Sequence, residues 1–294
     1  MIDYLIFLLY KSFKFIILSL PKFLIKFFLD KLASLIYLVN KEHKKYAKAN
    51  LDLVYGDTIS ENRKKEIIKA SYTNLVYNLY EFIENQTLCL EQFNDKIDVK
   101  NEDFILDALK NNRKIILITA HYGNWEYGNS FIPLKYAPTT MVGRPMNNKY
   151  LNKELDEART RNNTEMLSKR DASRGLVKAL KNNRILGLVV DQHNRSGIDV
   201  NFFGQKVKQA DSVARLAIKF DAIILPLFFT MESFGKYKAS FYEPLDPRNY
   251  SSDDKIKELT QAQADVMQKH ILLKPEQWFW QHKRFKEYNK DIYK

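Results

Sequence analysis

A histidine and a glutamate in one short motif are the first residues of this chain that could do chemistry. His121 opens the hexapeptide His-Tyr-Gly-Asn-Trp-Glu, which ends at Glu126. A neutral imidazole, with a pKa of about 6.5, can take a proton from an attacking hydroxyl, and a nearby carboxylate can fix its tautomer. Along a helix these two residues are rotated by about 140°, so they meet only if His121 precedes the first turn. Gly123 eases that bend; the alternative is a surface histidine beside a polar helix start.

The residues around His121 predict where this motif sits. The run Lys114–Ala120 is almost entirely apolar or β-branched, which is typical of a strand buried on both faces, and a helical pattern follows His121. Asp191 follows a second such run, Ile185–Val190. Both side chains therefore lie at carboxyl ends of strands, where open α/β sheets bind ligands. Asp191 could instead cap the next turn.

Along the rest of the chain, segments with strand patterns alternate with segments with helical patterns. We predict an α/β fold with a mostly parallel central sheet flanked by helices. Residues 41–294 form one catalytic domain, because no flexible linker follows residue 60. Further strands are expected at Thr139–Val142, Ile223–Phe229 and Tyr237–Tyr242, and helices at Tyr150–Arg161, Ser173–Lys181, Ser212–Phe220 and Asp253–Leu273.

Residues 1–40 are the most apolar part of the chain. Lys11, Lys14, Lys22 and Lys26 interrupt them, so no run reaches the ~20 apolar residues of a spanning helix. The four lysines share one side of the helical wheel, which is typical of amphipathic helices that lie on a membrane with their lysines at anionic headgroups. Pro21 is expected to divide the segment into two helices. The alternative is that it packs onto the core of the protein.

Composition restricts the possible partners and chemistries. Lys and Arg number 47 against 35 Asp and Glu, a formal net charge of +12. This indicates an anionic partner: phospholipid, a phosphorylated substrate, an acidic carrier protein or nucleic acid. The single cysteine, Cys89, excludes an intramolecular disulfide and Cys-based zinc sites. Zinc-hydrolase, nucleotide-binding P-loop and dinucleotide motifs are absent from the sequence.

The hexapeptide resembles the His-x4-Asp/Glu motif of membrane-associated acyltransferases, in the form found in the late lipid A acyltransferases. Further blocks follow in the order of that family, and together they span most of the chain from about position 40 onwards. They are Arg144-Pro-Met-Asn-Asn148, Arg159 in a charged helix, Asp191-Gln192, Phe202-Phe-Gly204, Pro275–Trp280 and His282-Lys-Arg284. The fold implied is that of the glycerol-3-phosphate acyltransferases.

The resemblance also implies roles for individual residues. His121 would be the general base and Glu126 its orienting carboxylate, while Asp191 would belong to the active site. Arg159, near the end of its helix, would polarise the acyl carbonyl or hold a phosphate, together with backbone amides near Gly123. Its alternative role is to stabilise the helix terminus. Substrate-binding residues would be Asn124, Arg144, Arg161, Gln192, Phe202 and Phe203. Residues 200–204 would form a loop, whose two phenylalanines would line an acyl groove or simply pack in the core.

The function implied is transfer of a fatty acyl group from an acyl carrier protein thioester to a hydroxyl of a lipid A precursor. The enzyme would work on an anionic membrane surface, at the cytoplasmic face of the bacterial inner membrane, without a metal or cofactor. One alternative is acylation of glycerophospholipid or of a phosphatidylinositol mannoside. Another is a basic membrane-binding or nucleic-acid-binding protein, but no nucleic-acid recognition motif is visible. Trp278 and Trp280 would anchor at headgroup level or close the core.

Overall fold

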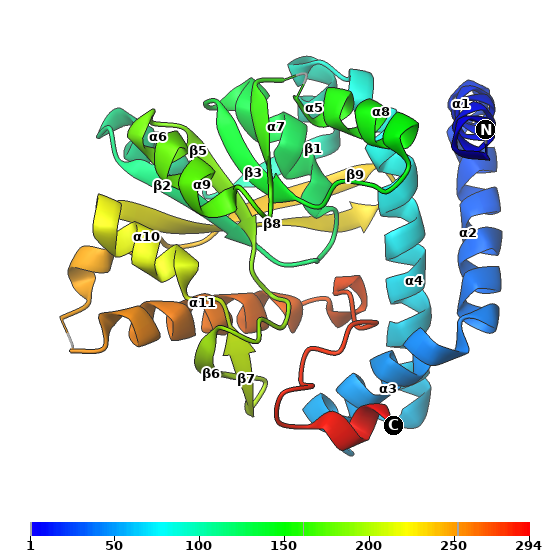
Figure 1. Cartoon of the computed structure of the whole chain (residues 1–294). Coiled ribbons are helices and arrows are strands. Elements are labelled where there is room, and N and C mark those ends of the chain that lie inside the picture. The colour runs from blue at the N-terminus through cyan, green and yellow to red at the C-terminus, as the bar shows by residue number, and fades with distance from the viewer. Residues whose placement is uncertain (1, 161, 252) are drawn as a thin grey trace.

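A seven-stranded sheet forms the centre of the molecule in the computed structural model, which describes residues 2–160, 162–251 and 253–294 (Figure 1). All neighbouring strands of this sheet are parallel except β8 and β9. The prediction of an α/β fold with a mostly parallel sheet is therefore confirmed. The strand order is β1 (Ile97–Lys100), β9 (Lys236–Phe241), β8 (Ala222–Ser233), β2 (Lys114–Thr119), β5 (Ile185–Val189), β3 (Thr139–Gly143) and β4 (Thr164–Ser168).

Helices cover both faces of the sheet, which explains the unbroken apolar runs of its strands. Ile116 and Ile118 of β2 belong to the buried cluster on one face, with α9, α10 and α11, whereas Ile115 and Leu117 belong to the cluster on the other, with α5, α6 and α7. The helices are α5 (Leu90–Lys96), α6 (Asp103–Lys110), α7 (Gly128–Lys135), α8 (Lys149–Thr160), α9 (Ala172–Lys181), α10 (Ser212–Phe220) and α11 (Lys255–Ile271).

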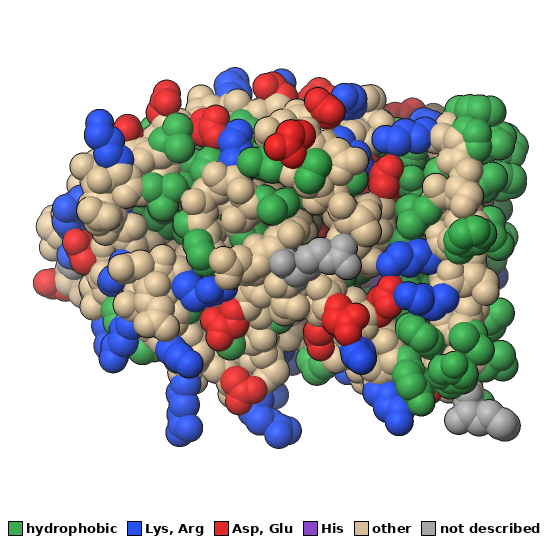
Figure 2. Space-filling view, turned by 90° about the horizontal axis from the view of Figure 1, so that it is seen from above, with side chains coloured by type: hydrophobic (Ala, Val, Ile, Leu, Met, Phe, Trp, Pro, Cys, Tyr) green, Lys and Arg blue, Asp and Glu red, His purple; other side chains and the backbone are tan. Residues whose placement is uncertain are grey.

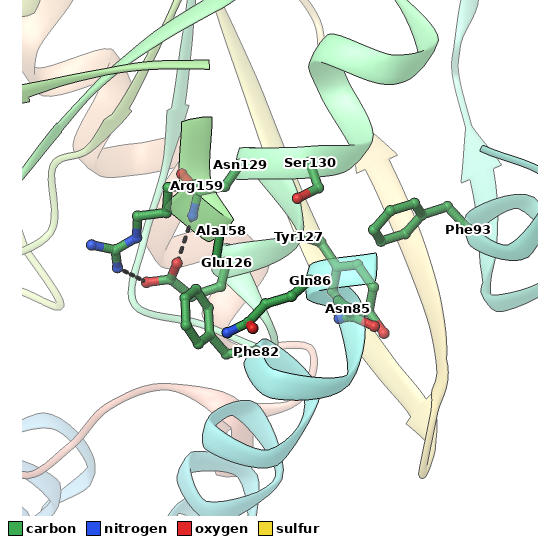
Figure 3. A pocket seen from close by; sticks show the side chains of 10 residues that line it. All are labelled: Phe82, Asn85, Gln86, Phe93, Glu126, Tyr127, Asn129, Ser130, Ala158 and Arg159. Atoms are coloured by element: carbon green, nitrogen blue, oxygen red, sulfur yellow. Dashed lines mark hydrogen bonds and ion pairs between the residues drawn. The ribbon is translucent and has the colours of Figure 1, made fainter. Parts of the chain in front are cut away.

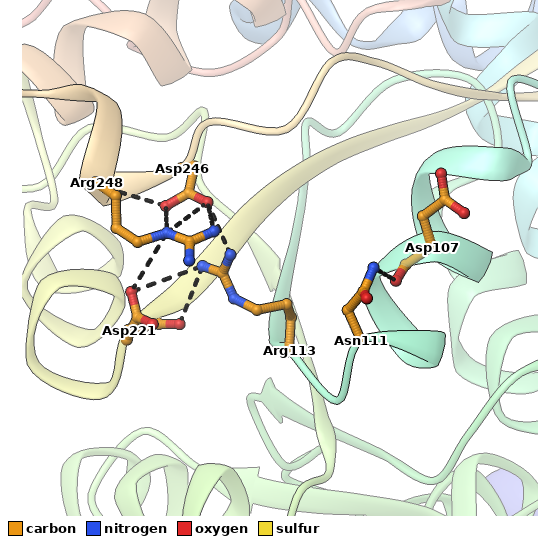
Figure 4. Close-up of polar contacts among 6 residues, drawn as sticks. All are labelled: Asp107, Asn111, Arg113, Asp221, Asp246 and Arg248. Atoms are coloured by element: carbon orange, nitrogen blue, oxygen red, sulfur yellow. Dashed lines mark hydrogen bonds and ion pairs between the residues drawn. The ribbon is translucent and has the colours of Figure 1, made fainter.

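Ion pairs hold the amino ends of the two central strands together. Arg113, just before β2, lies 2.8 Å from Asp246 and 3.6 Å from Asp221, the residue before β8 (Figure 4). Arg248 pairs with the same Asp246 at 2.6 Å. This cluster lies at the sheet edge opposite the carboxyl ends of the strands, so the edge that carries His121 is left open for other contacts.

Residues 200–204, expected to form a loop, instead belong to a β-hairpin. Strands β6 (Ile198–Phe202) and β7 (Gln205–Gln209) pair antiparallel across a turn at Phe203 and Gly204, both with positive φ. The reason is the alternation of buried and more exposed residues, with Val200 and Val207 facing the core. The sequence contained this period-two pattern, but the glycine suggested only a loop.

The N-terminal segment forms two helices, α1 (Ile2–Ser19) and α2 (Lys22–Val39), divided at Pro21 as predicted. Helix α3 (Lys41–Tyr55) follows, and α2 runs along the long helix α4 (Glu61–Glu84), whose N-cap is Ser60 (Figure 1). Residues of α1, α2 and α4 form a buried cluster of their own: Ile17, Ile25, Leu29, Ala33, Val76, Tyr77 and Tyr80. One side of the segment thus packs onto the protein, in line with the alternative raised from the sequence.

Three of the four lysines in the sequence pattern, which placed them at lipid headgroups, pair with acidic residues of other helices of the protein instead. Lys11 and Lys14 lie 3.1 and 2.8 Å from Glu154 of α8, and Lys22 lies 3.5 Å from Glu84 of α4. The cause is the pair of acidic partners on α8 and α4, which the helical wheel of a single segment cannot reveal. The apolar side is therefore turned outwards, and Figure 2 shows hydrophobic side chains gathered over these helices. In the described part of the chain, no helix combines the length and the apolar character needed to cross a bilayer.

Candidate active site

The pairing of β2 with β5 brings His121 and Asp191 together. Thr119 is the partner of Val189 in this parallel pair, so continuing the register by two residues sets His121 beside Asp191. Val190 supports this alignment, because its amide donates to the carbonyl of Thr119 at 3.0 Å. Both side chains thus leave the sheet at its carboxyl edge, where the sequence predicted them.

Asp191 is fully buried and accepts three hydrogen bonds. Its Oδ1 lies 2.7 Å from His121 Nδ1, while Oδ2 accepts from the His121 amide at 3.0 Å and from the Trp278 indole at 2.8 Å. Burial alone would raise the pKa of Asp191, but the charge and the hydrogen bond of His121 outweigh it and hold that pKa well below its usual range. The carboxylate is therefore ionised, and it can only accept.

His121 consequently carries its proton on Nδ1, which leaves the lone pair of Nε2 free to take another. The side chain is 23% exposed, and none of the described residues bonds to Nε2. Burial lowers the pKa of His121, whereas Asp191 and, more weakly, Glu126 raise it, and the net effect is a pKa above the ordinary value. The ring packs edge-on against Trp125, with centroids 5.0 Å apart. This geometry suits a general base that faces an open space.

Glu126 does not orient His121, and that prediction is wrong in the structure. Its Oε1 lies 2.9 Å from Arg159 Nη2, and its Oε2 accepts from Asn129 Nδ2 at 2.5 Å. Glu126 lies in the short 3-10 turn η2 (Trp125–Tyr127), which starts only after Asn124, and this turn brings its carboxylate to Arg159 and Asn129. Figure 3 shows Glu126 between Arg159 and Asn129. The carboxylate at His121 Nδ1 is Asp191 instead.

Arg159 is held beside Glu126 by several contacts. Besides Glu126, its guanidinium lies over the ring of Phe82, 5.5 Å from the centroid. The adjoining cavity, lined also by Tyr127, Ser130 and Gln86, has about 10 Å³, space for about one water molecule (Figure 3). An acyl chain cannot enter it. On its other side, Arg159 borders a second cavity, of about 300 Å³, together with Arg144.

Helix α4 holds the motif from behind through a row of polar residues. Asn74 and Asn78 donate to the carbonyl of Gly123 at 3.1 and 2.5 Å, and Glu81 accepts from Asn124 at 2.6 Å. These three α4 residues follow helical spacing and are buried. The apolar residues of α4 recur at helical spacing and indicate only an amphipathic helix, so they do not identify these three polar residues. Polar residues at helical spacing on an otherwise buried face were the available signal.

Gly123 needs its conformation for this arrangement. Its φ is +53°, and a Cβ there would meet the carbonyl oxygen of Phe229 at 1.7 Å. Its amide donates to the Gln277 carbonyl at 3.0 Å, and the next amide, that of Asn124, donates to Phe229 at 3.1 Å. These two backbone amides are therefore already used, and the prediction that amides near Gly123 stabilise an oxyanion is not supported by their geometry.

The other predicted binding residues differ in where they lie. Asn124 is buried and holds the motif to Glu81, so it faces the protein and not a substrate. Phe202 and Phe203 are also buried; they pack on Trp278, with centroids 5.8 Å away in each case, so they support the tryptophan that holds Asp191 and do not line a groove. The core-packing alternative is the one observed.

Arg144 and Gln192 are exposed at the same sheet edge as the dyad, and their binding roles stay predictions. Arg161 lies outside the described residues. Trp278 and Trp280 are fully buried, so they close the core and are not positioned at headgroup level. Among the described residues, no group of three His, Cys, Asp or Glu side chains is arranged to hold a metal ion.

A mostly parallel sheet with a buried acid–histidine pair at its carboxyl edge is the arrangement of an α/β enzyme. Comparison with known protein families shows which kind of enzyme it is. Residues 1–287 match the family model described as bacterial lipid A biosynthesis acyltransferase, so the chain belongs to this family and is an acyltransferase.

Individual relatives are distant and of two kinds. The chain is 26% identical to the phosphatidylinositol mannoside acyltransferase of Mycolicibacterium smegmatis, over 72% of this chain and 70% of that protein. It is also 26% identical to the lipid A biosynthesis palmitoleoyltransferase of Escherichia coli, over 84% of this chain and 79% of the relative. The lipid A biosynthesis lauroyltransferase of the same organism gives 26% identity, with 84% and 80% covered. Among solved structures, the 1-acyl-sn-glycerophosphate acyltransferase PlsC of Thermotoga maritima matches with a TM-score of 0.40 and 14% identity, over 84% of this chain and 96% of that chain.

Proposed function

We propose that this protein transfers a fatty acyl group from an acyl carrier protein thioester to a hydroxyl of a lipid A precursor, with His121 as the general base. The observation that carries the proposal is the hydrogen bond between His121 and the ionised, buried Asp191, which leaves Nε2 free at an open edge of the sheet. Membership of the lipid A acyltransferase family supports the acceptor.

The reaction needs one proton acceptor and no covalent enzyme intermediate. His121 Nε2 takes the proton of the acceptor hydroxyl while that oxygen attacks the thioester carbonyl. The C–O bond forms, the C–S bond breaks, and the imidazolium returns its proton to the departing thiolate. Asp191 stabilises the imidazolium in between. General-base help of this kind contributes about 10²–10⁴ to the rate.

Arg159 is the candidate for stabilising the thioester oxyanion. Its pairing with Glu126 fixes the guanidinium, and it borders the cavity of about 300 Å³ that Arg144 also lines. Fixed donors near the reacting carbonyl act without having to reorganise during the reaction. In this view Glu126 serves catalysis through Arg159 and not through the imidazole.

The site of action is the cytoplasmic face of the bacterial inner membrane. The outward side of α1 and α2 supports this, since 17 large hydrophobic side chains of residues 2–39 are exposed there, against eight in the remaining described residues. An amphipathic surface of this size can lie in the headgroup region of an anionic leaflet. Lys11, Lys14 and Lys22 are paired with acidic residues, and Lys31 lies over the ring of the exposed Phe27.

A phosphatidylinositol mannoside is the second candidate acceptor, because a relative with that named activity covers 72% of the chain. To separate the two, the purified protein is incubated with acyl carrier protein thioester and either a lipid A precursor or a phosphatidylinositol mannoside, and the products are analysed by mass spectrometry. The proposal expects acylation of the lipid A precursor, lost in His121→Ala. Acylation of the mannoside alone would replace it by the second candidate.

A further inference from the structure

A cavity of about 830 Å³ lies at the same sheet edge as the dyad and is lined mainly by cationic side chains. We call it the C-terminal basic cavity. Its six lysines and arginines are Lys169, Arg195, Lys283, Lys286, Lys290 and Lys294, and its carboxylate is Glu287. Lys169 follows β4 and Arg195 lies in the segment after β5, while the other four belong to the C-terminal tail. Three separate segments therefore direct positive charge into one volume.

Most of this charge has no partner inside the protein. In the described ranges, Lys169, Arg195, Lys286 and Lys290 form no ion pair, and Lys283 lies over the ring of Tyr46 at 4.1 Å. The carboxylate of Glu287 is used by His193, 3.5 Å away. Like charges gathered around one cavity repel each other, and a cleft of one sign focuses its field on whatever enters. The arrangement is therefore suited to an anionic ligand.

The wall formed by the C-terminal tail is held firmly. Asn50 of α3 donates to the carbonyls of Trp280 and His282 at 2.7 and 2.8 Å. Tyr293 is buried, donates to Asn50 and accepts from the Phe285 amide at 3.1 Å. The tail lysines therefore project from an ordered scaffold, which lowers the entropy cost of gathering them around a ligand.

The cavity lies near the catalytic dyad, although neither His121 nor Asp191 lines it. Lys169 is close enough to His121 to act on its charge, and His193 follows Asp191 by two residues. Arg284, which is buried, donates to the Gln192 carbonyl at 3.3 Å and so links the tail to the segment after β5. A ligand in this cavity would thus lie next to the place where the acceptor hydroxyl must approach Nε2.

We propose that the C-terminal basic cavity binds a phosphate group of the acceptor lipid headgroup and thereby positions the acceptor for acylation. This rests on the proposed function. A volume of about 830 Å³ is in the range of small-ligand sites and can hold a phosphorylated sugar. An acidic carrier protein is the other possible occupant, because five of the six cations are exposed, and the kinetic test below separates the two. Lysines suit phosphate as point charges that can adjust around it.

The test combines three substitutions, Lys169→Gln, Lys286→Gln and Lys290→Gln. The matched control is Lys110→Gln, Lys181→Gln and Lys219→Gln, which removes the same charge from exposed lysines at the C-terminal turns of α6, α9 and α10, at the opposite sheet edge. We expect the first variant to raise KM for a phosphorylated acceptor at least about tenfold, with KM for the acyl donor unchanged. The effect should disappear with a dephosphorylated acceptor, and the control should behave like the wild type.

Three outcomes would overturn the proposal. KM for the donor could rise while that for the acceptor stays constant, which would make the cavity the docking site of the carrier protein. The loss of activity could be equal with phosphorylated and dephosphorylated acceptors, or equal in the control variant.

A separate titration with inorganic pyrophosphate, monitored by calorimetry, measures binding to the cavity without acyl transfer. Binding that is weakened in the first variant and kept in the control supports the cavity even if the acceptor is not a lipid A precursor, and binding equal in both excludes it.

Discussion

The contacts of the His121 imidazole favour a role as general base. Asp191 accepts hydrogen bonds from Nδ1 and from the backbone amide of His121, so both the tautomer and the orientation of the imidazole ring are fixed. Trp278 donates to the other side of that carboxylate and keeps it ionised in a fully buried position. At the scale of single residues, the site is thus a chain of three groups, Trp278, Asp191 and His121.

Trp278→Phe should lower kcat by about tenfold while it leaves KM for both substrates nearly unchanged. The smaller ring leaves a void, as it also does in the control below, but here Asp191 loses one donor as well and holds the imidazolium less well. The matched control is Trp280→Phe, whose indole donates to the Pro275 carbonyl at 2.7 Å and not to the dyad. Steady-state kinetics of the two variants check this, and an equal loss of kcat in both would contradict a role of the indole at Asp191.

At the scale of elements, helix α4 and strands β2 and β5 determine where the motif lies. The buried carboxyl of Glu81 is central to the α4 contacts, because it accepts from Asn124 and from the hydroxyl of Tyr237 at 2.6 Å. Burial raises its pKa from 4.5 to about 7, and its hydrogen bonds and Lys96 offset only part of that shift. The folded protein therefore keeps a proton on Glu81 at pH values where the unfolded chain has released it.

This shift predicts a pH dependence of stability. As the pH rises from 4.5 to about 7, deprotonation of Glu81 favours the unfolded chain, so its contribution to the free energy of unfolding falls. Glu81→Gln cannot lose a proton, and relative to the wild type it should gain up to about 3 kcal/mol between pH 5 and pH 8. Urea unfolding at both pH values measures this, with the exposed Glu66→Gln of the same helix as control. If Glu81→Gln and the wild type differed in free energy of unfolding by the same amount at both pH values, this would contradict a buried, protonated Glu81.

The elements themselves were largely predictable, whereas their partners were not. The apolar run before His121 and the one before Asp191 identified two strands, and Pro21 identified a helix boundary. Which strand lies beside β2 depends on long-range pairing, and the β2–β5 register is what gives His121 its carboxylate. Spacing along the chain favoured Glu126 because it is close in sequence. The lysines of α1 and the asparagines of α4 were likewise visible in the sequence, but their partners, Glu154 and the Gly123 carbonyl, lie far away along the chain.

At the scale of the whole molecule, two surfaces of opposite character flank the site. The outward side of α1 and α2 is apolar, and the C-terminal basic cavity is cationic. An enzyme whose acceptor has a phosphorylated headgroup and fatty chains needs both. The apolar surface would keep the protein at the membrane while the cavity takes the headgroup.

If the outward side of α1 and α2 contacts the membrane as proposed, polar substitutions there should weaken binding to vesicles. Phe23 and Phe27 are 71% and 54% exposed on α2, so replacing both with Gln should leave folding intact. Each phenylalanine contributes about 1.5–3 kcal/mol when buried, so affinity for phosphatidylglycerol vesicles should fall more than tenfold. Cosedimentation measures this, with Leu106→Gln and Leu273→Gln, at exposed positions outside the N-terminal helices, as the control. Equal binding of both double variants would exclude α2 as the membrane contact.

The most direct test of the account is the pH dependence of kcat/KM in the wild type, Asp191→Asn and Glu126→Gln. This profile reports the free enzyme's essential base. For the wild type we predict activity that rises with pH through an apparent pKa above the ordinary imidazole value, because Asp191 raises the pKa of His121. Asp191→Asn should move that pKa downwards and reduce the plateau by about 10³–10⁴, as loss of an orienting carboxylate does in catalytic triads. Glu126→Gln should lower activity through Arg159 with a much smaller change of the apparent pKa. An Asp191→Asn variant with a wild-type profile, beside a shifted profile in Glu126→Gln, would contradict the central claim.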